Sequence, residues 1–515
     1  MTRGNIKLAA VRKAVILVLT CVIVLSFAVA AFAQTPTVTG VLNGADFSTH
    51  LCPGLLVGIY GSNFGSGPVS GVTVSVGGKT AYVAGVTPAQ INAQLPFDAT
   101  TGTAINLTVT VGGATSAPFS ITLGSYAPAM FTADGLGSAG SGAGLIRTAT
   151  GATITSAAPA KPGDTVTAYA AGLGQTNPAS TTGSTAANPL ATKPTLTVGG
   201  ATASLTYYGT SSIPGLYQIN FTVPAGLQGT VPVTISIGGQ TSSSVTLALF
   251  GIYAVVNNAS FAAGTIAAPG SIVSVFANGL GTTNQTVGFP ATAFQGISVT
   301  FNGTSAPLFH LNATAGTIDL LMPQELPTSG TVNVQLITPA ATSPNFALTM
   351  VPAEPGMYYI ADPSTKNRFN ILAQFNATLW LAMPASMAAA LNIAACTSSS
   401  TPLTVCAQPA TAGSYLVLYT TGLGEATPNG DPNGTPLKTG AIAPADGSVL
   451  YKSVVTPTVT VGGLPANVLF SGIAPGFTGL YQIDFQVPAG VTGDDVPVVV
   501  AVGTSPSDTR TVAIH

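Results

Sequence analysis

The stretch YQINFTVP (217–224) decides the fold class of this chain. Its odd positions, Tyr217 to Val223, are apolar, and the positions between them are polar. A period of two is that of a β-strand with one buried and one solvated face. Pro224 then ends the strand, because proline has no amide N–H to give to the ladder. The stretch returns as YQIDFQVP (481–488), so the same half-buried strand is predicted twice.

Both copies close a longer phrase that occurs four times in the 515 residues. An opening strand with a glycine turn is followed by a second strand and turn, and then by the strand that ends at proline. The opening strands are PGLLVGIYGSNFG (53–65), PGDTVTAYAAGLG (162–174), PGSIVSVFANGLG (269–281) and the looser AGSYLVLYTTGLG (412–424). This fixed order of strands and turns predicts an all-β fold, a tandem array of four β-sandwiches.

The four copies group into two pairs, because the segments around them recur as well. VLNGADF (41–47) returns as VVNNASF (255–261), each time leading into a pair. SYAPAMFTADG (125–135) returns loosely as AEPGMYYIADP (353–363), each time between the two members of a pair. We therefore expect domains at 35–124, 125–250, 251–351 and 352–515, with lengths typical of β-sandwiches.

The last domain carries an insertion. Pro384 lies 28 residues before Ala412 (412 − 384), whereas the equivalent Pro159 lies three residues before Pro162 (162 − 159). The extra residues, near 386–410, include the only segment with a helical pattern, PASMAAALNIAA (384–395), and the pair Cys396 and Cys406. Two cysteines this close in an exported chain predict a disulfide. The disulfide-linked insertion is either a tolerated addition at the surface or a segment that determines which partner the protein binds.

The N-terminus reads as a targeting segment. Four basic residues precede an apolar run, Ala14 to Ala31, and Ala31-Phe32-Ala33 fits a small-x-small cleavage site. We expect a signal peptide at 1–33 that is removed before Gln34. The alternative is an uncleaved segment that anchors the chain in the membrane, and no later stretch offers a membrane attachment.

The net charge of the chain limits the classes of partner that it is expected to bind. Removing residues 1–33 leaves nine basic residues (13 − 4) and 15 acidic ones, a net charge of −6 (9 − 15). An acidic chain with no basic patch is not expected to bind nucleic acid. Only 5% of the residues are charged, which leaves little repulsion between molecules and permits self-association. Cys52 remains without a partner, and we expect it to be buried near a strand start, with an intermolecular disulfide as the alternative.

The repeated sequence motifs resemble those of known domains. PGLLVGIYGSNFG (53–65), VTVSVGGKTAYV (72–83) and the strand ending QLP (94–96) resemble the opening of an IPT/TIG immunoglobulin-like domain. VVNNASF, APGSIVSVFANGLG (268–281), GLGQTNP (172–178) and GLYQINFTVPAG (215–226) resemble an uncharacterised domain repeated in secreted acidobacterial proteins. The second and fourth copies have GLG in place of the Asn-Phe of the IPT/TIG turn. The resemblance implies immunoglobulin-like sandwiches with a surface or extracellular role, and it brings no catalytic residues.

No motif for a catalytic, metal or cofactor site is found. His50, His310 and His515 lie apart, and His50 with Cys52 lacks the other ligands of a zinc site. GLGSAG (135–140) matches a dinucleotide-binding pattern but lacks its strand and helix, so it reads as a connector. Asp431 and the pair Asp494-Asp495 are candidate calcium ligands without the spacing of a calcium loop, and turn formation explains them better. We therefore expect a protein that is not an enzyme and has no cofactor.

One outward position of the closing strand is polar in every copy. The four residues at this position are Asn92, Asn220, Asp319 and Asp484. A recurring polar ladder and a plain solvent-facing strand position both explain this pattern.

The leading prediction is an exported structural or adhesive protein of the cell surface or extracellular space, with the periplasm as the alternative compartment. Its partners would be surface or matrix proteins. The alternative is a carbohydrate-binding protein that stacks a polysaccharide on exposed aromatic rings. Tyr208, Tyr359 and Trp380 are the candidate platforms, since one member of each pair Tyr207-Tyr208 and Tyr358-Tyr359 should point outward. Aromatic residues gathered on one face would favour glycan binding, and scattered ones would favour a scaffold.

Overall fold

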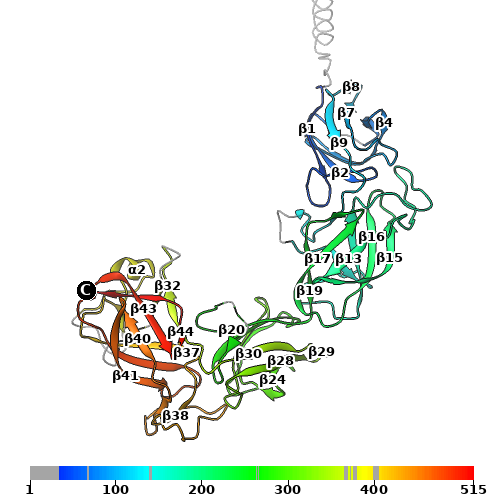
Figure 1. Cartoon of the computed structure of the whole chain (residues 1–515). Helices are drawn as coiled ribbons and strands as arrows, with labels where there is room; N and C mark the ends of the chain where they lie inside the picture. Colours follow the sequence, from blue (N-terminus) through cyan, green and yellow to red (C-terminus); the bar gives the residue numbers. More distant parts are fainter. Residues whose placement is uncertain are drawn as a thin grey trace, which may run out of the picture.

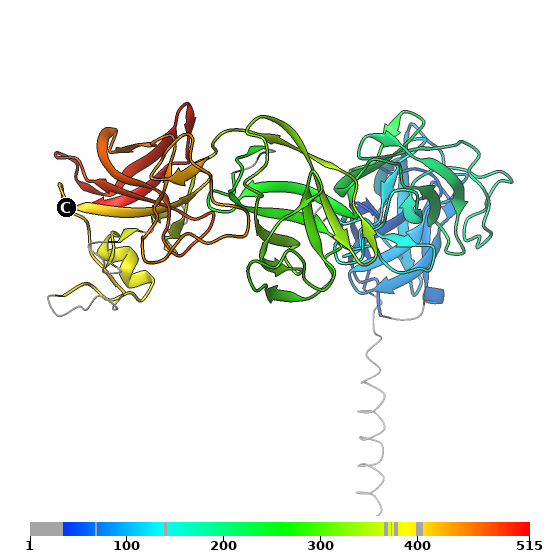
Figure 2. The ribbon, with the colours of Figure 1, turned by 90° about the horizontal axis from the view of Figure 1, so that it is seen from below.

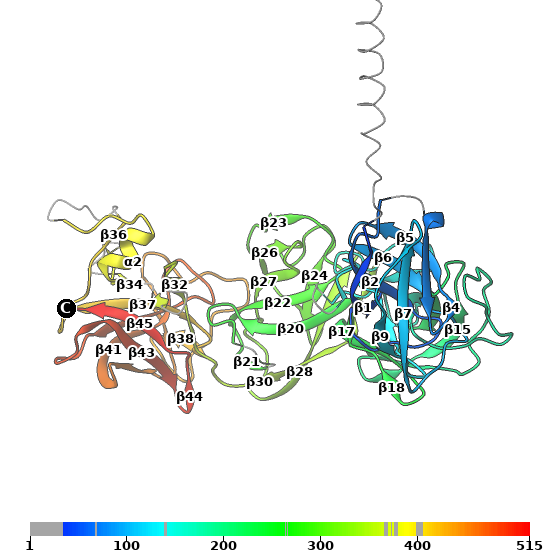
Figure 3. The same cartoon turned by 90° about the horizontal axis from the view of Figure 1, so that it is seen from above.

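The computed structural model describes residues 34–66, 69–137, 142–262, 264, 266–364, 369–371, 373–374, 380–397 and 405–515. The predicted signal peptide, residues 138–140 of the GLGSAG match and most of the loop between Cys396 and Cys406 lie outside these residues. The described chain forms a bent row of packed β-sheets, from the blue sheets near Thr37 to the red strands near Ile514 (Figure 1). Views from below and above show the same order along the row (Figure 2, Figure 3). The predicted all-β class is confirmed.

The first sheet pair stacks the order β1-β2-β6-β5 on the order β4-β3-β7-β8, with β9 paired to β7. Its strands are β1 (Thr37–Asn43), β2 (Leu56–Ser62), β3 (Val72–Val76), β4 (Lys79–Thr80), β5 (Tyr82–Thr87), β6 (Gln90–Gln94), β7 (Ala104–Val111), β8 (Ala114–Thr115) and β9 (Phe119–Thr122), and the 3-10 turn η1 (Val69–Gly71) precedes β3. In β3, Val72, Val74 and Val76 are buried while Thr73 is exposed. This alternation is what lets one face of each sheet close the core.

The second sheet pair repeats this plan, with the order β10-β12-β16-β15 on the order β14-β13-β17-β18. Its strands are β10 (Ala129–Met130), β11 (Ile146–Thr148), β12 (Thr165–Ala171), β13 (Thr195–Val198), β14 (Ala201–Thr202), β15 (Ser204–Thr210), β16 (Tyr217–Thr222), β17 (Gly229–Ile237), β18 (Gln240–Thr241) and β19 (Val245–Leu249). The alternation predicted from YQINFTVP is confirmed in β16, where Tyr217, Ile219 and Phe221 are fully buried and Gln218 and Asn220 are not.

The third sheet pair has the orders β20-β22-β27-β26-β23 and β21-β30-β28-β24-β25. Its strands are β20 (Gly251–Asn257), β21 (Ile266–Ala267), β22 (Ile272–Asn278), β23 (Asn284–Thr286), β24 (Ser298–Phe301), β25 (Thr304–Ser305), β26 (Leu308–Asn312), β27 (Thr317–Leu321), β28 (Gly330–Thr338), β29 (Ala341–Thr342) and β30 (Phe346–Met350). Strands β22, β27 and β26 are neighbours in one sheet (Figure 3), and they later supply one wall of a pocket.

The C-terminal sheet is continuous through β41, which pairs with β42 in one layer and with β40 in the other. Its strands are β31 (Gly356–Met357), β32 (Tyr359–Ala361), β33 (Phe369–Ile371), β34 (Ala373–Gln374), β37 (Tyr415–Thr421), β38 (Ala426–Pro428), β39 (Tyr451–Ser453), β40 (Thr458–Val461), β41 (Leu464–Ile473), β42 (Tyr481–Gln486), β43 (Gly493–Val502), β44 (Ser505–Pro506) and β45 (Arg510–Ile514). Tyr481, Ile483 and Phe485 of β42 fill its core.

The insertion and the strand before it form a small two-stranded sheet that packs against the C-terminal sheet. Strands β35 (Trp380–Leu381) and β36 (Cys406–Ala407) pair in parallel, and helix α2 (Ala385–Ala390) lies between them in sequence. The helix is shorter than the predicted range 384–395, because Asn392 takes a left-handed φ of 56°. The amide of Ile393 then donates to the carbonyl of Ala388 at 2.9 Å, which closes the helix end. Within the described residues, no helix has the length and apolar character needed to cross a membrane.

A β-bulge recurs in the hairpin that carries each closing strand. The pairing register shifts between Val83 and Gly85, between Leu205 and Tyr207, between Leu308 and His310, and between Val468 and Phe470. A bulge inserts one residue and reverses the side-chain phase of the rest of that strand. The same bulge at the same place supports the repeat predicted from sequence, and in β15 it decides where Tyr208 points.

Candidate functional site at the joints between sheets

The three aromatic residues predicted as sugar platforms do not share a face. Tyr208 lies in β15 and packs partly against the core of the second sheet pair. Trp380 packs partly against the core of the C-terminal sheet. The Arg510 guanidinium carbon lies 3.9 Å from the ring centroid of Tyr359. The rings are therefore scattered and partly covered, which is the arrangement that favours a scaffold.

The bulge explains why Tyr208 is not on the outer face as expected. Leu205 pairs with the buried Phe221, so unbroken alternation would turn Tyr208 outward. The bulge instead pairs Tyr207 with the half-exposed Asn220, and Tyr208 with the buried Ile219. Tyr207 is thus the outer member of the pair, and its hydroxyl donates to the carbonyl of Thr210 at 2.8 Å.

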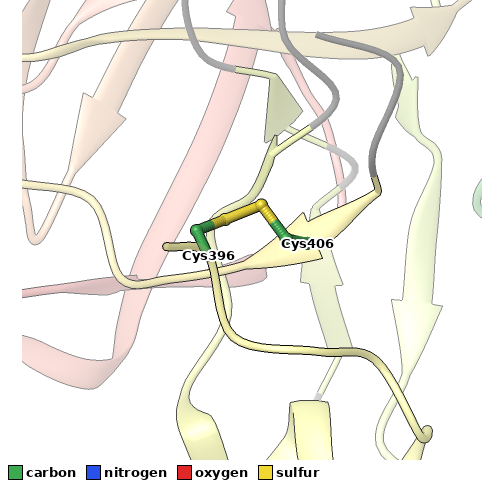
Figure 4. The surroundings of a disulfide bond; sticks show 2 residues. All are labelled: Cys396 and Cys406. Carbon is green, nitrogen blue, oxygen red and sulfur yellow. A yellow bond between two sulfur atoms is a disulfide. The ribbon is translucent and has the colours of Figure 1, made fainter. Parts of the chain in front are cut away.

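The predicted disulfide between Cys396 and Cys406 is confirmed (Figure 4). It lies in the same segment as the small hydrophobic cluster of Met383, Met387 and Ala407, against which Ile360 of β32 also packs. Closing a loop of about ten residues stabilises the folded state by about 2–3 kcal/mol in the chain-entropy model. The insertion is therefore held by its own covalent link and by a small hydrophobic cluster that it shares with β32.

The other candidate groups stay apart or form turns. Asp431 accepts the backbone N–H of Asn433 at 2.9 Å, which is the turn use expected of it. Asp494 lies 3.0 Å from the Nε2 atom of His515. In the part of the chain that the structure describes, no three His, Cys, Asp or Glu residues gather as a metal site would require.

The recurring polar position takes part in a short hydrogen bond in three copies. A glutamine two residues earlier donates its side-chain amide to Asn92 at 2.7 Å, to Asn220 at 2.9 Å and to Asp484 at 2.9 Å. The third copy has Thr317 in place of that glutamine. Asp319 therefore has other partners, and these belong to the joint described next.

Two joints connect neighbouring sheets in the same way. The first joint lies between the first and second sheet pairs, and the second joint lies between the third sheet pair and the C-terminal sheet. At the first joint the buried amide of Asn43 donates to the carbonyl of Ala127 at 3.2 Å. At the second joint the buried amide of Asn257 donates to the carbonyl of Glu354 at 2.8 Å. A buried amide that finds its acceptor on the next sheet fixes the connecting backbone, since leaving it unpaired is costly.

Further contacts repeat at both joints. The amide of Ala127 donates to the carbonyl of Gly172 at 3.0 Å, and the amide of Glu354 donates to the carbonyl of Gly422 at 2.8 Å. At the second joint, Thr421 accepts the amide of Ile272 at 2.8 Å and donates to the carbonyl of Gly479 at 2.9 Å. The connection is thus a set of backbone and side-chain hydrogen bonds instead of a free linker.

Each joint also holds a pocket. The first-joint pocket has a volume of about 520 Å³ and the second-joint pocket about 350 Å³. Three lining positions correspond in the aligned repeats: Leu56 and Ile272, Ile213 and Phe477, Leu216 and Leu480. Phe131 and Tyr358 correspond in the structure, because their amides donate to the equivalent carbonyls of Tyr169 and Tyr419. The pockets differ in charge, because Arg147 lines the first and Asp319 lines the second. The duplicated joints therefore share a pocket at the same place, but the charge of its lining differs.

Three lining residues of the second-joint pocket, Asp319, Asn258 and Tyr358, belong to a polar network that also includes the buried Ser274. The Oδ1 atom of Asp319 accepts the hydroxyl of Ser274 at 2.6 Å and the side-chain amide of Asn258 at 3.1 Å. That amide also donates to Ser274 at 2.8 Å, and the Oδ1 atom of Asn258 accepts the hydroxyl of Tyr358 at 3.1 Å. The Nδ1 atom of His310 lies 3.8 Å from the Oδ2 atom of Asp319, beyond hydrogen-bond distance.

Aromatic and aliphatic side chains form most of the rest of this pocket. Phe289 and Phe309 stack on each other with centroids 5.1 Å apart and planes 9° apart. Phe477 and Ile442 stand at the rim, with 53% of each exposed. Burial and the negative charge of Asp319 raise the pKa of Tyr358 above its ordinary range. The pocket is therefore apolar on most sides and negative on one.

The carboxyl of Glu354, whose backbone belongs to the second joint, is expected to make stability depend on pH. Burial raises the pKa of its carboxyl from 4.5 to about 7. Folding therefore favours the protonated acid, and this contribution to stability is complete below pH 4.5 and is lost as pH rises through about 7. We expect Glu354→Gln to gain in thermal midpoint over the parent at pH 8 more than at pH 5. A difference between the two proteins that is constant from pH 5 to pH 8 would contradict this.

The thiol of Cys52 is buried, as predicted, and lies four residues before β2 (56 − 52). Burial raises its pKa to about 12, so the reactive thiolate is scarce at pH 8. In protein that starts at Gln34 it is the one cysteine outside the disulfide. We expect a chromogenic disulfide reagent to find no thiol in the native protein and one thiol per chain in guanidinium. A full reaction in the native state would restore the intermolecular disulfide as an explanation.

No protein-family model matches the chain. No curated protein matches it either. Among solved structures, it is similar to the extracellular region of plexin A4, domains 1 to 10, at 12% identity and a TM-score of 0.26. That match covers 93% of this chain and 31% of the plexin chain, so the chain spans about a third of that protein.

Two bacterial surface proteins are also similar. One is the SGBP-B protein of the mixed-linkage glucan utilization locus of Bacteroides ovatus, at 13% identity and a TM-score of 0.15, over 82% of this chain and 84% of that one. The other is the S-layer protein rSbsC, at 11% identity and a TM-score of 0.16, over 94% of this chain and 54% of that one. With TM-scores this low, neither of them nor plexin A4 carries an argument about function.

The joint residues were not singled out from sequence as a site. The recurrence of VLNGADF as VVNNASF marks Asn43 and Asn257 as equivalent, but their acceptors lie 84 and 97 residues further along the chain. Phe477 carries a usable signal, since it stands in the loop before β42 where Ile213 stands before β16. Two exposed apolar residues at equivalent loop positions point to a shared surface.

Proposed function

We propose that the chain is an exported, non-enzymatic array of four immunoglobulin-like sandwiches of the IPT/TIG kind. Its role is structural or adhesive: it holds sandwich surfaces at fixed spacing for protein or matrix partners at the cell surface. The observation that carries this proposal is the joint built twice from the same parts. A protein that only tethers binding domains can use a flexible linker, whereas here a buried amide fixes the backbone at both of these joints.

Two further observations support the proposal. The disulfide of Cys396 and Cys406 is of the kind that persists in oxidising compartments outside the cytosol. The scattered positions of Tyr208, Tyr359 and Trp380 favour a scaffold over a polysaccharide platform, which needs aromatic rings on one open face.

Small-angle scattering of protein that starts at Gln34 tests the fixed spacing. We expect one bent-row shape for the parent and a broader spread of distances for the double variant Asn43→Ala, Asn257→Ala. The exposed Asn467 is a matched control, and Asn467→Ala should scatter as the parent does. A parent profile that itself requires a broad spread of shapes would overturn the proposal.

A panel of insoluble and arrayed polysaccharides tests the alternative in the same preparation. The scaffold proposal expects no saturable binding to any of them. Saturable binding to one polysaccharide would replace the scaffold by a glycan-binding function.

A further inference from the structure

We infer that the second-joint pocket binds a protonated primary alkylamine, presented as a lysine side chain of a protein partner. The inference rests on the proposed adhesive function and names the chemistry of its partner. It is carried by the polar lining residues Asp319, Asn258 and Tyr358, which Ser274 helps to hold, and by the aromatic rings that line the same pocket.

The first step is the count of free donors in the polar wall. Both N–H groups of the Asn258 amide are used, one on Ser274 and one on Asp319. The hydroxyl of Ser274 donates to Asp319, and the hydroxyl of Tyr358 donates to Asn258. These donors are all satisfied inside the wall. These residues therefore offer acceptors to a ligand, above all the Oδ2 atom of Asp319, while the buried hydroxyl of Thr478 is the one lining side chain without a partner that can also donate.

The second step concerns the kind of cation. The Oδ1 atom of Asp319 already accepts two hydrogen bonds, so the carboxylate presents one oxygen and not two. A guanidinium binds best to both oxygens of a carboxylate at once. An ammonium is a compact charge that needs a single acceptor. The geometry thus favours lysine over arginine.

The third step concerns the stem of the ligand. Phe289, Phe309, Phe477, Ile272 and Ile442 line the pocket with apolar surface. The four methylenes of a lysine side chain bury well along such a surface while the ammonium reaches the charge. Aromatic faces also attract a cation that lies over them. The methylenes of lysine can therefore pack on the apolar residues of the pocket while its ammonium reaches Asp319.

The first-joint pocket supplies a comparison within the same chain. It has Arg147 in its lining and no carboxylate among its lining residues. The residue equivalent to Asp319 in the first sheet pair is Asn92. A cationic ligand should therefore bind at the second joint and be repelled at the first.

The test is titration of protein starting at Gln34 with Nα-acetyl-lysine amide, followed by calorimetry. The matched probe is Nα-acetyl-norleucine amide, which has the same aliphatic stem without the ammonium. We expect binding of the lysine probe at one site per chain and none of the norleucine probe. Asp319→Asn should lower the affinity for the lysine probe by about tenfold or more, because a charge-assisted hydrogen bond is lost.

The variants separate binding from folding. Asparagine at position 319 keeps an Oδ1 acceptor for Ser274 and Asn258, so the wall can persist without its charge. Asp484→Asn is the matched control, since this carboxylate occupies the equivalent strand position in the C-terminal sheet outside the pocket. Phe477→Ala removes an exposed rim residue and should weaken the lysine probe without lowering the thermal midpoint.

Three results would overturn the inference. These are equal binding by parent and Asp319→Asn, equal binding of the two probes, and an equal loss in Asp484→Asn. Binding of a neutral sugar that Asp319→Asn abolishes would also overturn it and assign the pocket to glycans. Absence of lysine-probe binding overturns the inference as well, but it leaves the scattering result untouched, so the spacer function and the ligand are judged separately.

Discussion

Replacing Tyr481 by alanine is expected to lower the free energy of unfolding of the C-terminal sheet by about 3–5 kcal/mol. The ring is fully buried between the layers of this sheet, and its hydroxyl donates to the carbonyl of Gly424. Alanine leaves a cavity and an unpaired buried carbonyl at once. Urea unfolding combined with hydrogen exchange of the peptides that contain β37 and β42 measures this loss in the right place.

Two control variants assign the effect to burial and to the hydroxyl. Tyr415 lies in β37 of the same sheet but is 49% exposed, so Tyr415→Ala should change stability by no more than about 0.5 kcal/mol. Tyr481→Phe keeps the ring and should cost about 1–3 kcal/mol, because the carbonyl of Gly424 loses its donor. If Tyr481→Ala and Tyr415→Ala unfold at the same urea concentration, the assignment of Tyr481 to the core is wrong.

The sequence predicts the strands well because burial in a sheet has a short, local period. The apolar positions of YQINFTVP are the buried positions of β16, and Pro224 follows two residues after its end (224 − 222). The helix end was misjudged for a local reason too. Asn392 adopts a left-handed φ, and the continuing alanine-rich pattern hides that stop.

The bulges and the pocket were beyond prediction for different physical reasons. A bulge adds one residue to a hairpin without a distinct composition, yet it turned Tyr208 from the outer face to the core. The pocket joins Phe289, Asp319 and Phe477, which are separated by 30 and 158 residues (319 − 289 and 477 − 319). Only the pairing of sheets across the second joint brings such residues together.

Replacing Gly422 by alanine is expected to open the second joint. Gly422 has a φ of +81°, and a Cβ atom there would overlap the carbonyl oxygen of Glu354. That carbonyl is held in place by the amide of Asn257, so the backbone cannot yield without breaking the joint. The left-handed conformation costs alanine about 1–2 kcal/mol, and the overlap adds about 1–3 kcal/mol.

Gly413 separates these two costs. It has the same φ of +81°, and a Cβ atom there would meet nothing within 4 Å. Gly413→Ala should therefore show the conformational cost alone and leave the joint closed. Hydrogen exchange at the amides of Glu354 and Met357 should rise in Gly422→Ala and not in Gly413→Ala. Equal exchange and equal loss of stability in both variants would mean that the contact with Glu354 does not hold the joint, and the fixed spacing would lose its physical basis.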